Sequence, residues 1–291
     1  MKYEFIDNKL HIQNDKFNTI EEFLNHFKQS KKNKYLLLQN KQILINDEVV
    51  KYIHTNIFNK QITLILEDNK VDWKPSSKKC EIIYEDPFVL IVHKQAGIII
   101  HSDTNEECLN NEVARYYVDH DIHTTIRPIH RLDKETTGLV IYSKIPFFQP
   151  YFDYQLEEKR IHREYLAVVI GNRNIGDIFT VNKPIGRDRH ISNKYRISKN
   201  GKDSITHFEV IGKKHGYNLI RCTLETGRTH QIRVHLSSIG LPIVNDSIYG
   251  IASSDFKEMG LFAQNVTFYN PLTNKKHKIK DLHEHFTHFF K

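Results

Sequence analysis

The chain has 291 residues, 39% of them hydrophobic, which is enough to bury the core of one large domain or of two smaller ones. Its 42 lysine and arginine residues outnumber 35 aspartate and glutamate residues, for a net charge of +7. That excess suits a polyanionic partner such as nucleic acid, although ordinary soluble proteins are often equally basic. No run reaches the roughly 18 apolar residues of a membrane span, and MKYEFIDNKL lacks the apolar core of a signal peptide, so we expect a soluble, cytoplasmic protein.

The cysteines and histidines argue against disulfide bonds and against a metal site. The three cysteines are Cys80, Cys108 and Cys222. Their odd number and wide spacing are typical of a reducing compartment, and no C-x-x-C pair is present. Two groups of histidines lie close along the chain: His230 with His235, and His283 with His285 and His288. Because neither group fits H-E-x-x-H, we expect no metal and interpret the tail histidines as a solvated helix end.

Residues 1–72 predict a small N-terminal α/β domain. TIEEFLNHF carries its apolar residues on one helical face, and Thr19 with Glu22 forms a capping-box pattern. LLLQNKQILINDEVV then predicts strands around turns at residues 39–41 and 46–47, and ITLILED at residues 62–68 predicts a closing strand. Residues 73–80 are polar and include Pro75, so they are expected to be a linker.

Residues 81–291 predict a larger domain in which strands predominate. CEIIYEDPFVLIVHKQAGIIIH predicts two strands around an Asp-Pro turn, followed by a turn at Gly97. LNNEVARYYVDH and FFQPYFDYQLEEKRI predict helices, whereas GLVIYSK, HREYLAVVIG and HFEVIGKKHGYNLIRCTLE predict strands. TGRTHQIRVHLSSIGLP predicts a further helix, capped by Thr229. Since strands and helices do not alternate regularly, we expect an α+β fold with a central, mostly antiparallel mixed sheet flanked by helices and loops.

The stretch HRLDKETTG places one carboxylate, Asp133, between Arg131 and Lys134. The two cations favour its ionised form, and a positioned, ionised carboxylate can act as a nucleophile or a base. On local chemistry alone, a structural ion pair is the better explanation. The following ETTG, which contains Thr136, supplies the hydroxyl groups and the glycine of a tight turn.

Two further stretches could contribute to the same chemistry. In TGRTHQIRVH, Arg228 lies at the mouth of the predicted helix, where it could reach a carboxylate or a phosphate. A helix with basic, solvated residues explains this pattern equally well. In REYLAVV, Tyr165 is either a core aromatic residue or a ring on which a flipped base stacks.

In this order, HRLDKETTGLVIYSK, REYLAVVIG, KPIGR and TGRTHQIRVHLSSIGLPIVNDSIYG resemble the RluA family of pseudouridine synthases over roughly residues 81–271. The family motif H-R-L-D-x-x-T-[ST]-G is matched at residues 130–138, and T-G-R-T-H-Q-I-R-V-H is matched at every position of residues 226–235. The resemblance implies the pseudouridine synthase fold and the isomerisation of specific uridines in ribosomal or transfer RNA. It also implies a monomer that needs no cofactor and binds neither DNA nor membrane.

The resemblance implies catalytic roles for Asp133, Tyr165 and Arg228. Asp133 would act on the ribose, either as a nucleophile at C1′ or as a base at C2′. Tyr165 would stack on the uracil, and Arg228 would form an ion pair with Asp133. The RNA-binding residues implied by the resemblance are Arg131, in the space left by the flipped nucleotide, Ile232 and Val234, which wall the base pocket, and His130, Thr136, Arg187, His230 and Arg233.

The chain departs from the family pattern at several positions, which leaves its substrate and loop geometry open. The departures are Gln95 after Lys94 in place of proline, Arg163 in place of lysine, Leu241, Asn245 and Ser247 in place of histidine, glycine and proline, and Phe262 in place of histidine. An RNA-binding ribosome-assembly factor with secondary activity is the alternative function. A glycosidase that uses Asp133 with Glu135 is disfavoured, because the two acids lie two residues apart on a turn.

The N-terminal domain weakly resembles the small RNA-binding module first seen in ribosomal protein S-four. The resemblance rests on the helix, the hairpin and the closing strand of residues 19–66. It implies that the basic stretch KQSKKNK, residues 28–34, faces RNA phosphates. A packing appendage without an RNA contact is the alternative.

Overall fold

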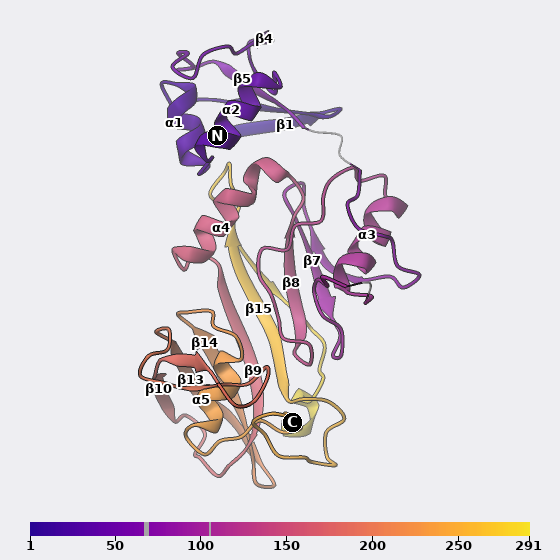
Figure 1. Cartoon of the computed structure of the whole chain (residues 1–291), viewed down its shortest axis with the longest axis vertical. Coiled ribbons are helices and arrows are strands. Elements are labelled where there is room, and N and C mark those ends of the chain that lie inside the picture. Colours follow the sequence, from indigo (N-terminus) through magenta and orange to yellow (C-terminus); the bar gives the residue numbers. More distant parts are fainter. Residues whose placement is uncertain (67–69, 105) are drawn as a thin grey trace.

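The computed structural model describes residues 1–66, 70–104 and 106–291. Figure 1 shows an elongated molecule, with the first 65 residues at one end and the C-terminal tail near the other. The described strands form two sheets of five and nine strands and a separate two-stranded ribbon. In the described part of the chain, no helix is long and apolar enough to cross a membrane.

The first sheet is antiparallel and has the strand order β1-β2-β5-β3-β4. Its strands are β1 (Lys2–Ile6), β2 (Lys9–Gln13), β3 (Ile43–Ile45), β4 (Glu48–Val49) and β5 (Gln61–Ile65). The helices α1 (Ile20–His26) and α2 (Lys31–Gln39) lie beside this sheet (Figure 1). The predicted helix is confirmed as α1, and the hydroxyl of Thr19 accepts a hydrogen bond from the Glu22 amide as the capping pattern predicts.

Residues 31–39 differ from the sequence prediction, which placed a basic loop and the start of a strand there. They form α2, because Ser30 caps this helix by accepting a hydrogen bond from the Asn33 amide at 3.1 Å. The turn at residues 46–47 is confirmed, with positive φ angles of 47° and 68° that suit a tight hairpin. The closing strand is confirmed as β5, while residues 67 and 68 of that prediction lie outside the described residues.

The nine-stranded sheet confirms the predicted α+β class. Its order is β10-β13-β14-β9-β15-β8-β7-β6, with β16 also paired to β15, and only the β8–β15 pair is parallel among the described strands. The strands are β6 (Glu81–Glu85), β7 (Val89–Lys94), β8 (Thr137–Ser143), β9 (His162–Ile170), β10 (Ile178–Asn182), β13 (Ile205–Lys214), β14 (Tyr217–Leu224), β15 (Leu261–Tyr269) and β16 (Lys276–Lys280). β11 (Ile185–Arg187) and β12 (Tyr195–Ile197) form the ribbon.

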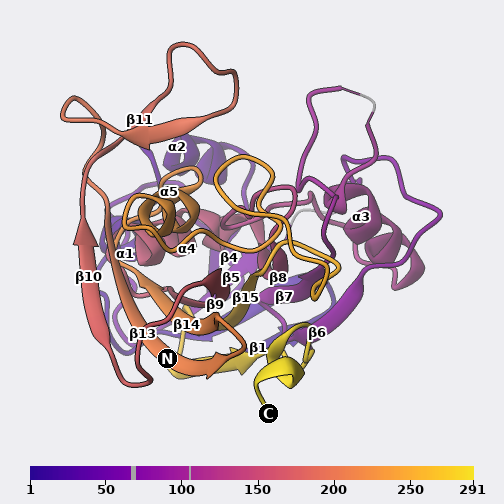
Figure 2. The same cartoon turned by 90° about the horizontal axis from the view of Figure 1, so that it is seen from below.

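The remaining helices cover one side of this sheet, and the C-terminal tail covers the other (Figure 2). The helices on the first side are α3 (Leu109–Asp119), η1 (Pro146–Phe148), α4 (Gln149–Glu157) and α5 (Gln231–Ser237), and the tail contains η2 (Thr287–Phe290). α3 packs on β7 and β8, and α5 packs on β9, β13 and β14. In the sheet, β8 and β9 are both neighbours of β15. The loop before β8 and one face of β9 therefore lie close together, between α3 and α5.

An aromatic cluster joins the N-terminal sheet to the rest of the molecule. The rings of Phe23 in α1 and of Phe27, its C-cap residue, contact Phe147 and Phe148, with centroid separations between 5.2 and 5.9 Å. The side chain of Gln29 also donates a hydrogen bond to the Phe147 carbonyl at 2.6 Å. Burial of this much aromatic surface favours a fixed orientation of the two sheets.

Candidate active site

A cavity of about 1250 Å³ opens between the loop before β8, the face of β9 and the start of α5. Its lining includes most of the residues that the motifs singled out: His130, Arg131, Asp133, Thr136, Tyr165, Arg228, His230, Ile232 and Arg233. Residues 130–136 and 226–233 are almost 100 positions apart in the chain, and the sheet brings them together. A cavity of this size exceeds the usual range for a small ligand and leaves room for a nucleotide with part of its backbone.

Backbone hydrogen bonds hold the loop that carries Asp133. The Asp133 carbonyl accepts a hydrogen bond from the Thr136 amide at 3.1 Å, which closes the turn. The carbonyl of Lys134 accepts from the Gly97 amide at 3.0 Å and from the Lys94 ammonium at 2.8 Å. Lys94 is fully buried, and its ammonium also donates to the carbonyls of Gln95 and Ile98. Lys94 therefore holds the Asp133 loop in place through its hydrogen bond to the Lys134 carbonyl.

The carboxylate of Asp133 is paired with Arg233, the third residue of α5. The guanidinium Nη1 of Arg233 lies 3.2 Å from Oδ2 of Asp133. Its other nitrogens, Nε and Nη2, donate to Asp246 at 2.7 and 2.8 Å. Only 4% of the Arg233 side chain is exposed. Such a buried, bidentate pair fixes the direction of the guanidinium, which in turn orients the Asp133 carboxylate.

Asp246 is the buried anchor of this arrangement. Burial alone would raise the pKa of its carboxyl, but the hydrogen bonds and charge of Arg233, with the amides of Ile248 and Tyr249, hold the pKa below its usual value. The preceding residue, Asn245, has φ 56°, a left-handed conformation that asparagine tolerates. The departure from glycine at this position therefore preserves the turn that presents Asp246.

His230 forms a second contact to the Asp133 carboxylate. Its Nε2 atom lies 3.9 Å from Oδ2 of Asp133, and its Nδ1 atom lies 2.9 Å from the hydroxyl of Tyr249. That hydroxyl accepts a hydrogen bond from the Tyr195 amide at 2.7 Å, so the β11–β12 ribbon is tied to the cavity wall. Burial lowers the pKa of His230 and, although the charge of Asp133 opposes this, the imidazole is held towards its neutral form.

Tyr165 lies on the floor of the cavity, with only 5% of its surface exposed. Burial raises the pKa of its phenol, with the charge of Arg163 opposing and that of Asp133 adding to this shift, so the hydroxyl is protonated at neutral pH. The guanidinium of Arg163 also approaches Gly227, where an added Cβ would lie 3.2 Å from its Nη2 atom. The arginine that replaces the family's usual lysine therefore contacts the loop before α5 as well as Tyr165.

His130 is buried beneath the same loop. Among the described residues, neither of its ring nitrogens has a hydrogen-bond partner. Burial, assisted by the charge of Arg163, lowers its pKa to about 3, so the ring is neutral at physiological pH. The neutral His130 ring thus fills space beneath the catalytic loop without placing a second charge next to Arg131.

The structure differs from two expectations. Asp133 pairs with Arg233 and not with Arg228, which is exposed and donates through Nε to the Asp203 carbonyl at 3.0 Å. Val234, expected to wall the base pocket, is buried and is not among the described residues that line the cavity. Arg187 lies in the β11–β12 ribbon and outside the cavity lining, and its RNA contact stays a prediction.

The helix cap explains why Arg233 and not Arg228 reaches the carboxylate. Thr229 does not cap α5. The cap is His230 in a left-handed conformation with φ 58°, and the side chain of Gln231 accepts hydrogen bonds from the Arg228 amide and the Thr226 hydroxyl. This tight start turns Arg228 out of the helix and directs Arg233 into the protein.

Sequence reasoning missed three residues that organise the site: Lys94, Asp246 and Tyr249. Each acts through a partner far away in the chain, so local spacing carries no signal for it. The aspartate in the VNDSIYG stretch is the one feature that could have directed attention there, since a carboxylate is the natural partner for a buried arginine of α5.

The fold, the paired carboxylate and the buried tyrosine within an open, basic cavity define a class of RNA-modifying enzyme, which the comparisons with known proteins identify. A family model described as "RNA pseudouridylate synthase" matches residues 88–238, which include the Asp133 loop, Tyr165 and the start of α5. The chain belongs to this family and, more narrowly, to the RluA family of RNA pseudouridine synthases. It is an isomerase that acts on uridines in RNA.

Several curated relatives are similar over most of the chain. The uncharacterized RNA pseudouridine synthases YhcT and YlyB of Bacillus subtilis (strain 168) are each 34% identical, covering 82% and 80% of this chain and 80% and 79% of their own. The ribosomal large subunit pseudouridine synthase D of Vibrio vulnificus is 30% identical, covering 88% of this chain and 83% of its own. Among solved structures, human RNA pseudouridylate synthase domain containing 1 has a TM-score of 0.61 at 22% identity, covering 73% of this chain and 87% of its own, which supports the fold.

Proposed function

We propose that this enzyme isomerises uridines in ribosomal RNA, with Asp133 as the catalytic carboxylate. The observation that carries the proposal is the position of that carboxylate inside the cavity, 3.2 Å from the buried Arg233 guanidinium. We assign to Arg233 the pairing role that the family resemblance implied for Arg228. Tyr165 and Ile232 line the same cavity and supply the surface on which a uracil ring would rest.

The proposed chemistry uses only side chains. The target uridine must first leave its stack, which costs a few kcal/mol and less in a loop or bulge. The Asp133 carboxylate then attacks C1′ of the ribose or removes the proton from C2′, and the bond from C1′ to N1 of uracil breaks. The freed uracil anion rotates, and its C5 bonds to C1′: in the first route C5 displaces the Asp133 carboxylate from C1′, and in the second C2′ takes back its proton as the C5–C1′ bond forms. The C5 proton then passes to a base or to solvent, and N1 takes up a proton. The two routes require the same oriented carboxylate.

The surrounding groups support this sequence through charge and shape. Arg233 orients the carboxylate, and the exposed cations Arg131, Lys134 and Arg228 line a cavity that receives a polyanion. The protonated hydroxyl of Tyr165 is available as a hydrogen-bond donor to the uracil while its charge changes. The proposed steps need no metal ion and no redox cofactor.

Ribosomal RNA is the proposed substrate because relatives that are 30% to 35% identical are named ribosomal large subunit pseudouridine synthase D. This substrate implies that the enzyme acts in the cytoplasm, and we propose that it acts as a monomer. We divide the chain into an N-terminal RNA-binding domain (1–72), a linker (73–80) and a catalytic domain (81–291). Lys31 and Lys32 are exposed at the start of α2 and are suited to contact phosphates.

The test is tritium release from RNA labelled at C5 of uridine, because rejoining through C5 must expel that hydrogen. Large-subunit ribosomal RNA and transfer RNA transcribed in vitro are compared as substrates. We expect the unaltered enzyme to release tritium from ribosomal RNA, and Asp133→Asn to release none above background while it still binds RNA. Glu135→Gln is the matched control on the same loop and should keep its activity. Turnover by Asp133→Asn at the rate of the unaltered enzyme would refute the catalytic assignment.

A further inference from the structure

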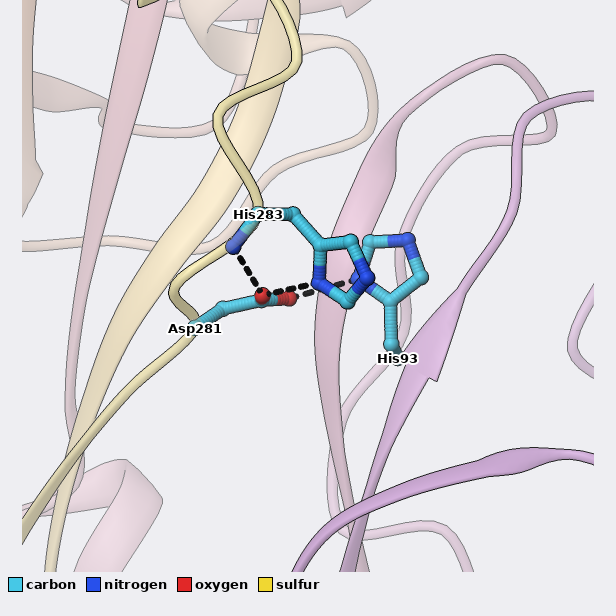
Figure 3. A group of neighbouring side chains, drawn as sticks. All are labelled: His93, Asp281 and His283. Carbon is cyan, nitrogen blue, oxygen red and sulfur yellow. Dashed lines mark hydrogen bonds and ion pairs between the residues drawn. The ribbon is translucent and has the colours of Figure 1, made fainter.

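Three potential metal ligands meet on the side of the sheet that faces away from the cavity. Figure 3 shows His93, at the end of β7, with Asp281 and His283, which follow β16. The Nδ1 atom of His93 lies 2.5 Å from Oδ2 of Asp281, and the Nδ1 atom of His283 lies 2.6 Å from Oδ1 of the same carboxylate. One donor atom from each residue lies within 4.8 Å of the other two.

The surroundings of this cluster are unusual for a simple ion pair. The His93 residue is 2% exposed and Asp281 is fully buried. Among the described residues, the buried Nε2 atoms of His93 and of the neighbouring His285 have no hydrogen-bond partner. The rings of His93 and His285 are stacked with centroids 5.2 Å apart. Three imidazoles therefore lie around one buried carboxylate, and the two buried Nε2 atoms have no hydrogen-bond partner among the described residues.

His283 and His285 therefore do not belong to the solvated helix end that the sequence predicted, whereas His288 is exposed in the short helix η2. The chain turns back after β16, so that His285 packs 4.5 Å from the ring of Phe262, and Phe286 is buried. Phe262 occupies a position where the family usually has histidine, so here a tail imidazole packs against the aromatic ring that replaces it. Burial, followed by the charge of His93, lowers the pKa of His285 to about 4, which keeps this ring neutral.

We propose that His93, Asp281 and His283 bind one divalent transition metal ion, of which Zn²⁺ is the best match. Two imidazoles and one carboxylate are a typical zinc ligand set, whereas Mg²⁺ and Ca²⁺ prefer ligands that are all oxygen. In a tetrahedral zinc site, neighbouring ligand atoms are about 3.3 Å apart. The two Nδ1 atoms now donate protons to Asp281, and the ion would take the place of those protons through small side-chain rotations.

A second carboxylate supports this assignment. Oε1 of Glu81, at the start of β6, lies 3.2 Å from the Nε2 atom of His283. A histidine that binds zinc through one nitrogen usually donates a hydrogen bond from the other nitrogen to a carboxylate or a carbonyl. Glu81 is placed to accept that hydrogen bond when Nδ1 of His283 binds the ion. The structure thus contains both the ligands and a group that orients one of them.

The proposed ion would fasten the C-terminal tail to the strand that supports the active site. Successive residues of a strand face opposite sides of the sheet. His93 thus faces the tail, while Lys94 reaches the carbonyl of Lys134 next to the catalytic loop. The amide of Asp281 also donates to the Gln264 carbonyl at 2.8 Å, which joins the tail to β15. A metal here would hold β7, β15 and the tail together.

The experiment measures zinc binding by the full-length chain, produced without a polyhistidine tag and stripped of metal with a chelator. Zn²⁺ is added in competition with a chromogenic chelator, and Co²⁺ is added separately to record its visible absorption. The variants are Asp281→Asn, His283→Gln and Glu81→Gln. His288→Gln is the matched control, because His288 is exposed in the same tail and belongs to no part of the cluster. His283 is partly exposed, so its variant is expected to fold.

The unaltered chain should bind one Zn²⁺ tightly, and the ion should raise its thermal unfolding midpoint. Loss of an outer orienting group usually weakens a site about 10- to 100-fold, so Glu81→Gln should fall in that range. Asp281→Asn and His283→Gln should lose at least about 100-fold, and His288→Gln should match the unaltered chain. The proposal is overturned if the unaltered chain binds no zinc, or if His283→Gln and Asp281→Asn bind it as tightly as the unaltered chain does.

Discussion

Replacing Arg233 by lysine tests the central electrostatic feature of the site. Lysine keeps the positive charge but has a single ammonium group, so it cannot donate to Asp133 and bidentately to Asp246 at the same time. The contact to Asp133, 3.2 Å long, is one charge-assisted hydrogen bond, worth about 1.5–3 kcal/mol. If that energy orients the carboxylate in the transition state, Arg233→Lys should slow tritium release by roughly 10- to 150-fold.

The same substitution should affect stability in a way that can be separated from catalysis. It removes one of two hydrogen bonds to the buried Asp246 and should lower the free energy of unfolding by about 1.5–3 kcal/mol. Arg233→Met, which leaves Asp246 without its cationic partner, should cost about 3–5 kcal/mol. Urea unfolding gives these values, and single-turnover tritium release is measured at a temperature where each variant is fully folded.

Arg228→Lys is the matched control, since the family resemblance implied that Arg228 is the partner of Asp133. Among the described residues, its side chain donates a hydrogen bond to the Asp203 carbonyl and to no other group, and the residue is exposed. Arg228→Lys should therefore retain tritium release within about threefold and lose less than about 0.5 kcal/mol of stability. A large loss of activity in Arg228→Lys, with Arg233→Lys unaffected, would refute the assignment of the ion pair to Arg233.

Three further predictions follow from buried positions near the catalytic loop. Gly138→Ala should destabilise the protein by at least about 2 kcal/mol in urea, because φ is +110° and the new Cβ would lie 2.3 Å from the Ala263 carbonyl oxygen. Stability close to that of the unaltered chain would contradict this. Lys94→Met should cost about 1–3 kcal/mol and slow tritium release, because three carbonyls, including that of Lys134, lose a donor. Unchanged release would show that the loop needs no such anchor. Burial lowers the pKa of His130 to about 3, so the unfolded chain binds more protons between pH 6.5 and about 3, and stability should fall as the pH drops through this window. Urea unfolding at pH 7 and pH 5 measures the slope, which should be shallower in His130→Gln.

The sequence determined the type of most elements, because their signals are local. Short apolar segments bounded by turn residues predicted β6 to β9, and the positive φ angles at the His215–Gly216 turn of the β13–β14 hairpin agree with the residues found there. The same dependence on local signals explains the wrong prediction for residues 31–39. KKNKYLLLQ contains strong helix formers but no clear amphipathic pattern, and the cap at Ser30 made it a helix where a loop and strand were expected.

Motif spacing also carried the enzyme class, since Asp133 and Tyr165 stand at fixed positions in long, specific matches to the RluA family. Motif spacing did not identify which arginine pairs with Asp133. Arg228 and Arg233 are both arginines of the same motif, and only the left-handed backbone at His230, which sets where α5 begins, decides which one points inward. That decision is made by the tertiary packing of the helix against Asp246 and the sheet.

The tail cluster shows the same limit over a longer distance. His93 and Asp281 are 188 residues apart, and no pattern in the chain relates them. They meet because β16 pairs with β15, and only β8 separates β15 from β7 in the sheet, so strand order and not sequence spacing sets the distance. Side chains that are distant in the sequence become ligands, anchors or ion pairs only when the sheet has formed, and for that reason only the tertiary structure decided which of them act together.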